Sequence, residues 1–149
     1  MGAEKGTVEA IFLAAEHSSL PHEVPSATGF PGRGLEGDRH FDDPDAGDIT
    51  LIEKEAIEAM RTEHGTDLPP ASVRRQVLVR DADLAQFVGR RFRIGEIECE
   101  GQERCEPCDY MAGIVGTQAV LKGLLHTGLR AAIIKGGTIR AGDTVELIS

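Results

Sequence analysis

Short apolar segments separated by glycine-containing turns run through this sequence, and they restrict the possible fold more than any other feature. The chain of 149 residues contains 18 glycines, several of them in pairs or beside aspartate. Glycine adopts the backbone angles of tight turns without strain, so this spacing predicts many turns between short strands. Apolar and alternating patterns predict strands over residues 7–13, 49–51, 76–79, 92–94, 97–101, 129–134 and 144–148.

Helical patterns are few, and they do not alternate with the strands. One helix is expected directly after the second strand, with its end at Gly65. Another is expected over residues 117–125, and a single helical turn over residues 84–88. Without βαβ alternation, the pattern predicts an all-β barrel or sandwich with a few inserted helices rather than a doubly wound sheet. No linker divides the chain, so we expect a single domain over residues 1–149.

Charge and composition exclude several classes of function. The formal net charge of −9 is unsuited to electrostatic binding of nucleic acid or of anionic membranes. No apolar run approaches the ~20 residues that span a bilayer, and residues 1–7 lack a signal-peptide core, so we expect a cytoplasmic protein. The three cysteines are an odd number, and in a reducing compartment they do not predict a disulfide framework.

Residues 16–47 are rich in proline, glycine, aspartate and histidine, and we expect a long irregular loop there. Loops of this length are often functional. Within it, the string Gly37-Asp38-Arg39-His40 combines a permissive backbone with two side chains that can hold an anion. The pair Arg74-Arg75 precedes one strand and Arg130 begins another, and from pattern alone each arginine would face either a pocket or solvent.

The segment Arg104-Cys105-Glu106-Pro107-Cys108-Asp109 is the most specific local feature. It follows a predicted strand, and free N–H groups at the start of a helical turn would stabilise a thiolate at Cys108. Four interpretations remain open: a redox pair, part of a structural zinc site, a single functional thiol at Cys108, or inert buried cysteines. Cys99 lies two residues after Ile97 on the same predicted strand, so the two side chains face the same side. We therefore expect the Cys99 side chain in the core together with Ile97.

Taken together, these motifs resemble the MOSC (molybdenum cofactor sulfurase C-terminal) domain family. The matching motifs, in order, are Gly37–His40, Arg74–Gln76, Gly89–Gly95, Cys105–Cys108, Gly128–Ala131 and Gly136–Asp143. Each motif is only moderately specific, but all of them stand in the right order from about residue 6 to residue 148. The resemblance implies a small stand-alone member with a closed irregular β-barrel, similar to the pyruvate-kinase barrel, and a few inserted helices.

The resemblance also implies a chemistry. Cys108 stands at the position of the family's reactive cysteine, which is proposed to carry sulfur or to ligate molybdenum. A cysteine desulfurase or a redox partner would act with it. The residues expected to surround the pterin of the molybdenum cofactor (molybdopterin) are Asp38, Arg39, His40, Arg74, Arg75 and Arg130. We therefore expect these side chains and Cys108 to converge on one pocket.

Three functions remain open at this stage. The preferred function is binding of the molybdenum cofactor, with reduction of N-hydroxylated compounds as its catalytic form. The alternatives are a persulfide sulfur carrier without bound metal and a non-catalytic structural zinc or thiol interaction module. Gln76 departs from the family, in which asparagine usually follows the paired arginines. No lysine stands in a plausible Schiff-base setting, so pyridoxal phosphate is not expected.

Overall fold

The structure is a computed structural model that describes residues 5–15, 21–43, 47–65, 75–104 and 128–148. Strands dominate these residues, and helices are short. The elements in chain order are β1 (Lys5–Leu13), β2 (His22–Val24), β3 (Ser26–Phe30), β4 (Gly34–Leu35), β5 (Ile49–Glu53), α1 (Lys54–His64), β6 (Val77–Arg80), the 3₁₀ turn η2 (Leu84–Phe87), β7 (Arg91–Ile94), β8 (Ile97–Glu103), β9 (Leu129–Lys135), β10 (Gly137–Arg140) and β11 (Thr144–Leu147).

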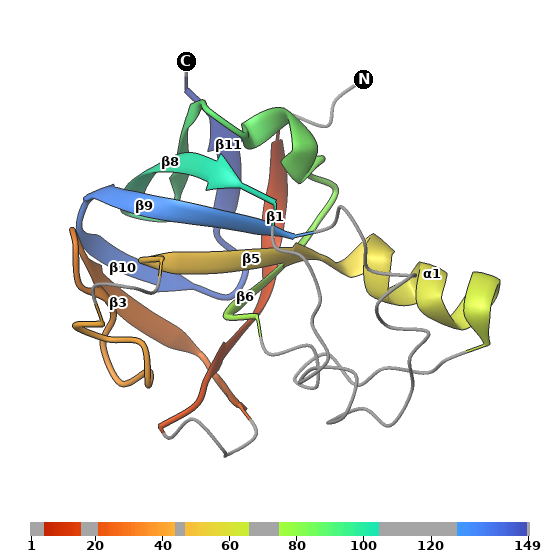
Figure 1. Ribbon diagram of the computed structural model, residues 1–149, viewed down its shortest axis with the longest axis horizontal. Helices are drawn as coiled ribbons and strands as arrows, with labels where there is room; N and C mark the ends of the chain where they lie inside the picture. The colour runs from red at the N-terminus through yellow and green to blue at the C-terminus, as the bar shows by residue number, and fades with distance from the viewer. Residues whose placement is uncertain (1–4, 16–20, 44–46, 66–74, 105–127, 149) are drawn as a thin grey trace.

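Seven of the described strands close into a barrel (Figure 1). Around the barrel the order is β1, β6, β5, β9, β8, β7 and β11, and pairing of β11 with β1 joins the ends of the sheet. Strands β5 and β6 run parallel, whereas the other neighbouring pairs of the ring are antiparallel. The structure therefore confirms the predicted all-β closed barrel with few helices.

Alternate side chains of the barrel strands point inward and form its core. Ile11, Leu51 and Val77 contribute from three adjacent strands, and each is fully buried. Phe87 and Phe92 meet edge to face, with their ring centroids 5.1 Å apart. Register shifts in β1 and β8 interrupt regular pairing, and such bulges help a sheet to bend into a closed barrel.

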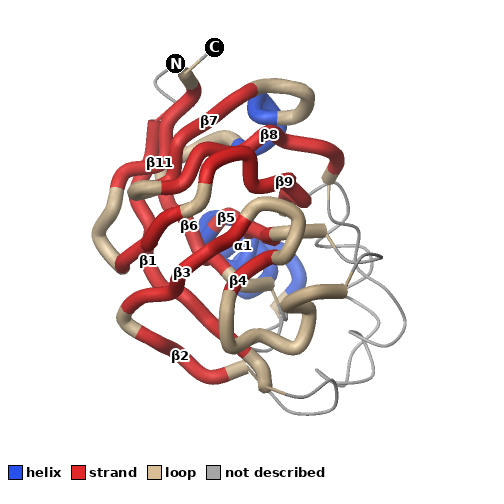
Figure 2. Tube along the Cα trace, turned by 90° about the vertical axis from the view of Figure 1, so that its left-hand side faces the viewer, coloured by secondary structure: helices blue, strands red, loops and turns tan. Residues whose placement is uncertain are grey.

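A second sheet of β10, β3 and β4 packs beside the barrel (Figure 2). Strands β2, β3 and β4 lie within residues 16–47, so the prediction of one irregular loop over that range is wrong. A Cβ atom added at Gly29 would lie 2.9 Å from side-chain atoms of both Ile97 and Ile133, so glycine lets β3 approach the barrel closely. The small residues of β3 form no clear alternating apolar pattern, and its pairing partner β10 is remote in sequence. For these reasons the sequence pattern did not predict this sheet.

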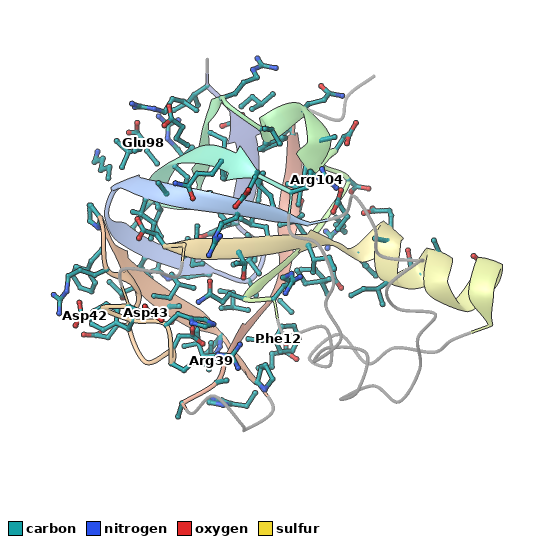
Figure 3. The ribbon with its side chains drawn as sticks, viewed as in Figure 1. Phe12, Arg39, Asp42, Asp43, Glu98 and Arg104 are labelled. Atoms are coloured by element: carbon teal, nitrogen blue, oxygen red, sulfur yellow. The ribbon has the colours of Figure 1, made fainter. Side chains whose placement is uncertain are left out.

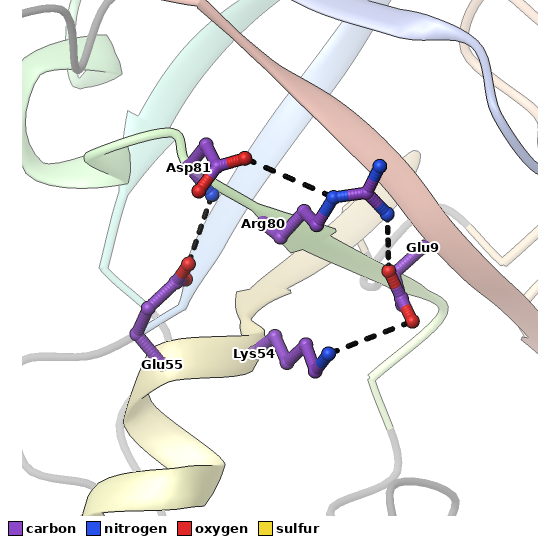
Figure 4. Close-up of polar contacts among 5 residues, drawn as sticks. All are labelled: Glu9, Lys54, Glu55, Arg80 and Asp81. Carbon is purple, nitrogen blue, oxygen red and sulfur yellow. Dashed lines mark hydrogen bonds and ion pairs between the residues drawn. The ribbon is translucent and has the colours of Figure 1, made fainter.

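Helix α1 follows directly on β5 and contacts β5 and β6, and its own side chain Ile57 is buried. Polar contacts of its first turn tie it to the barrel (Figure 4). The carboxylate of Glu55 accepts a hydrogen bond from the backbone N–H of Asp81 at 2.9 Å. The ammonium group of Lys54 lies 3.7 Å from Glu9 on β1. The helix is therefore an addition to the outside of the barrel rather than part of its core.

The helix predictions are confirmed where the structure describes the residues concerned. Helix α1 ends at His64, and Gly65 follows with a positive φ of 66°, a conformation that favours glycine. The expected turn near residue 84 is η2, which Asp83 caps by accepting a hydrogen bond from the N–H of Ala85. The helix expected over 117–125 lies outside the described residues. No helix within the described ranges is long and apolar enough to cross a membrane.

Candidate functional site

Strand register places a row of polar residues across the outer face of the barrel. Glu103 on β8 lies opposite Arg130 on β9, which lies opposite Thr50 on β5. Thr50 is linked to Gln76, whose N–H donates to the Thr50 hydroxyl at 3.0 Å and whose Oε1 accepts from the Thr50 N–H at 2.9 Å. The apolar Phe12 on β1 lies next to this row, and its backbone N–H donates to the Gln76 carbonyl at 2.7 Å. The residues that flank Phe12, Thr50 and Arg130 along their strands belong to the core cluster inside the barrel, so by alternation these three side chains face outward, although Phe12 itself is buried.

Asp38 fastens the loop of residues 36–43 to this row. Its Oδ1 accepts a hydrogen bond from the N–H of Ala14 at 3.0 Å. Its Oδ2 accepts from the side-chain amide of Gln76 at 2.9 Å and from the N–H of His40 at 3.2 Å. Only 8% of the residue is exposed, so these donors replace the water that a carboxylate otherwise requires. This arrangement favours a role for Asp38 in holding the loop rather than in direct contact with a ligand.

The loop and the row together enclose a small pocket beside β1. Arg39, His40 and Arg75 are among its lining residues, and Figure 3 shows Arg39 beside Phe12 at this end of the molecule. The Nε–H of Arg39 donates a hydrogen bond to Nε2 of His40 at 2.9 Å. The lining residues are Phe12, Ala14, Pro21, Asp38, Arg39, His40, Arg75 and Gln76.

Arg130 lies on the same face but not in the lining of this pocket. Its place in the row is two strands from Gln76, which corresponds to about 10 Å at the usual spacing between strands. Its guanidinium group pairs with Glu103 at 3.2 Å. The stem of the side chain runs past Gly47, where an added Cβ atom would come within 2.6 Å of the arginine Cγ. The expected convergence thus brings Asp38, Arg39, His40 and Arg75 together, with Arg130 at a distance.

A comparison with known families decides the identity of the fold. The family model described as the MOSC domain matches residues 36–146. The chain belongs to the MOSC domain family. No protein of curated function matches the sequence.

Solved structures of several bacterial proteins are similar to this MOSC domain over nearly its whole length. The YuaD protein of Bacillus subtilis has a TM-score of 0.84 at 17% identity, with 96% of this chain and 95% of that chain covered. YiiM of Geobacillus stearothermophilus has a TM-score of 0.77 at 13% identity, with 97% and 75% covered. YiiM of Escherichia coli has a TM-score of 0.71 at 16% identity, with 96% and 70% covered. At these identities the likeness establishes the fold alone.

The cysteines of this MOSC domain fall into two groups. Cys99 lies on β8 with its side chain fully buried in the barrel core, as predicted, and burial raises the pKa of its thiol far above the usual range. Cys105 and Cys108 lie outside the described residues, and so does Arg74. Within the described ranges, no cluster of three or more histidine, cysteine or acidic residues is suited to a metal ion. Cys99 is therefore not available as a third ligand beside the Cys-x-x-Cys pair.

Two residues of the site carry no sequence signal that would have singled them out. Neither was predicted as a site residue: Thr50 falls in the strand predicted over residues 49–51, and Gln76 begins the strand predicted over residues 76–79 and departs from the family pattern. The structure shows that they bind each other and that Gln76 also binds Asp38. Replacing the family's asparagine by glutamine adds one methylene group, and here the longer side chain spans from Thr50 to Asp38. An amide in this position therefore connects the barrel to the loop.

Proposed function

We propose that this MOSC protein binds the molybdenum cofactor or a related pterin at the outer face of the barrel, and that Cys108 is its sulfur-carrying or metal-ligating residue. The observation that carries the proposal is the gathering of Arg39, His40 and Arg75 around one pocket. Strand β8 runs to the same polar row and leads directly into the segment that contains Cys108. A cationic pocket and a thiol would then serve one bound molecule.

The donor set of the pocket suits the phosphate group of such a cofactor. Arg39 and Arg75 supply guanidinium groups, which bind phosphate through paired hydrogen bonds. The negative charge of Asp38 is already compensated by three protein donors, so it opposes an anion less than an open carboxylate would. The described pocket is small, so we infer that it receives a terminal group such as phosphate rather than the whole pterin.

The residues of this chain would have separate roles in binding and chemistry. Arg39, Arg75 and the neighbouring Arg74 would bind the anionic end of the cofactor, and the hydrogen bonds of Asp38 would hold the Arg39 loop in place. Cys108 would act as a thiolate, the form in which cysteine is both a nucleophile and a metal ligand. When bound, the cofactor would supply a redox-active metal suited to the reduction of N-hydroxylated compounds. A free thiol of this kind fits a reducing compartment, and we therefore infer a cytoplasmic location.

Metal and pterin analysis of the protein purified from a host that makes the cofactor tests the proposal. We expect molybdenum and, after oxidation, pterin fluorescence to co-purify with the protein. Arg39→Ala and Arg75→Ala should each lower retained cofactor about tenfold, because each removes a charge-assisted contact. The matched control is Arg140→Ala on β10, an exposed arginine that pairs with Glu96 away from the pocket. Equal loss in the control and the pocket variants would contradict the assignment of the pocket.

The same experiment distinguishes the roles of Cys105 and Cys108. Cys108→Ser should abolish loading of sulfur or molybdenum, whereas Cys105→Ser should weaken it only partly. A gain of one sulfur mass at Cys108 without metal would instead identify a persulfide carrier that acts with a cysteine desulfurase. Zinc held by both cysteines, with neither thiol reactive, would identify the structural interaction module and overturn the proposal.

A further inference from the structure

Two buried polar residues meet beside the pocket of Arg39 and Arg75. Among the described residues, Asp38 and Gln76 are the only polar or charged residues that are buried, with exposed fractions of 8% and 6%. The side-chain amide of Gln76 donates a hydrogen bond to Oδ2 of Asp38 at 2.9 Å. A buried carboxylate that loses a donor is left partly uncompensated, so this contact resists separation.

The orientation of the Gln76 amide follows from its two partners. Its Oε1 accepts a hydrogen bond from the backbone N–H of Thr50, a group that can only donate. Its Nε2 faces the carboxylate of Asp38, which accepts. The reversed amide would set donor against donor at Thr50 and acceptor against acceptor at Asp38. A single orientation therefore satisfies both contacts.

The side chain of Gln76 links the two arginine-bearing segments of the pocket. The backbone of Gln76 is held on both sides, because its carbonyl accepts a hydrogen bond from β1 at 2.7 Å and its N–H donates to a hydroxyl on β5 at 3.0 Å. These bonds place Arg75, the preceding residue. At its far end the side chain binds Asp38, the residue before Arg39. The length of one glutamine side chain thus relates the segment of Arg75 to that of Arg39.

We propose that Gln76 is a positioning residue that sets the separation of Arg39 and Arg75 for a single tetrahedral anion. Two guanidinium groups bind one anion strongly only when both are placed to reach it, so a displaced loop weakens binding. The role belongs to the amide, because an apolar side chain of equal length cannot donate to Asp38 and accept from Thr50. The inference deepens the proposed function and rests on its anion-binding pocket.

Sulfate binding by the full-length protein tests this role. Sulfate is the probe because its charge stays constant over the pH range used, whereas that of a phosphate group changes. In NMR titrations, Gln76→Met should weaken sulfate binding about tenfold, the factor expected for one charge-assisted hydrogen bond. The double variant Gln76→Met/Arg39→Ala should bind no more weakly than Arg39→Ala alone, because Gln76 acts through the placement of Arg39.

The pH profile of Gln76→Glu distinguishes positioning from a general effect on folding. At about pH 8 the new carboxylate would repel that of Asp38, and sulfate affinity should fall more than tenfold below that of the wild type. At about pH 5 the two carboxyl groups can share a proton that restores the hydrogen bond, so this deficit should shrink at least threefold. Arg39, His40 and Arg75 are the other charged or titratable residues lining the pocket, and the wild type measured at the same pH accounts for them. Gln76→Met should show an equal deficit at both pH values.

Gln86 on η2 provides a matched control. Its side-chain amide also donates to an aspartate, at 3.2 Å from Oδ2 of Asp83, and neither residue lines the pocket. Gln86→Glu should therefore bind sulfate as the wild type does at both pH values. Gln76→Asn keeps the amide but is one methylene group shorter, so we expect an intermediate affinity with no recovery at low pH. Circular dichroism at each pH shows which variants are folded.

Three results would overturn the inference. One is wild-type sulfate affinity in folded Gln76→Met and Gln76→Asn. Another is a deficit of folded Gln76→Glu that does not shrink at low pH. The third is a wild-type protein that binds no sulfate or binds it equally well after Arg39→Ala. Failure of the proposed function is seen separately, as a wild-type protein that binds sulfate through Arg39 but retains neither molybdenum nor pterin.

Discussion

Cys99 shows how the environment of a single residue decides its chemistry. Its side chain is fully buried on the inner face of β8, beside the apolar core. Burial disfavours the thiolate and raises the pKa of the thiol, and the nearby carboxylate of Asp48 adds to this effect. The reactive form of cysteine is the thiolate, so the folded protein keeps Cys99 inert. Any thiol chemistry of the native protein therefore belongs to the other two cysteines.

Substitution of Cys99 by alanine should cost stability without affecting thiol chemistry. We expect Cys99→Ala to lower the free energy of unfolding by about 1 kcal/mol through lost packing. The contribution of the raised pKa is present below the unfolded thiol pKa of about 8.5 and declines as the pH rises above it, so this variant should lose less stability between pH 8 and 10. Urea unfolding across this range measures both effects. Loss of Cys108 reactivity in the folded variant would contradict the assignment.

At the scale of elements, an ion-pair network joins β1, β6 and α1 on the outside of the barrel (Figure 4). Glu9 on β1 accepts a hydrogen bond from Arg80 at the end of β6 and lies near Lys54 at the start of α1. The hydrogen bond from Arg80 is the main reason that the pKa of the Glu9 carboxyl lies below its ordinary value. The network is partly exposed, so its contribution to stability is modest.

Replacing Glu9 by glutamine should change stability in a pH-dependent way. A lowered folded pKa stabilises the protein above the unfolded value near 4.5, and this contribution is lost as the pH falls through the folded pKa. We expect Glu9→Gln to lower the free energy of unfolding by about 0.5 kcal/mol at pH 7 and by nearly nothing at about pH 3. Exposed Glu58 on α1 provides the control, Glu58→Gln. A constant difference at all pH values would show that the charge of Glu9 is not responsible.

At the scale of the whole molecule, closure of the barrel joins distant parts of the chain. Strand β1 pairs with β11 near the other end of the chain, and β3 pairs with β10. The ring leaves no free edge between its first and last strands, which removes one route to unwanted strand pairing. Its inward side chains form one cluster, to which every strand of the ring contributes. This connectivity favours the interpretation of residues 1–149 as a single folding unit.

A single domain should unfold in one cooperative transition. We expect urea transitions followed by far-UV circular dichroism and by exposure of the Cys99 thiol to coincide, because secondary structure and barrel core would be lost together. Added denaturant should expose Cys99 only within that transition. Separate midpoints for the two signals would indicate that part of the chain unfolds independently and would contradict the single-domain proposal.

Features that depend on neighbouring residues could be predicted from the sequence. Alternating apolar residues marked most barrel strands, Gly65 marked the end of α1, and the parity of Ile97 and Cys99 placed that thiol in the core. These signals succeed because side chains alternate between the two faces of a strand and because glycine accepts a positive φ at a helix end. The motif order also identified the family, which the match over residues 36–146 confirms.

Contacts between residues that are distant in the sequence became known only from the folded structure. Strand β3 consists mostly of small residues and is placed by its pairing with β10, which no local pattern reveals. The register of β5 against β6 and β9 brings Thr50 beside Gln76 and Arg130, and the end of β5 carries Glu53 to Arg104. A shift of one residue would turn each of these side chains to the other face of the sheet. Contacts between strands depend on their register across the whole barrel. The local sequence of a single strand does not specify that register.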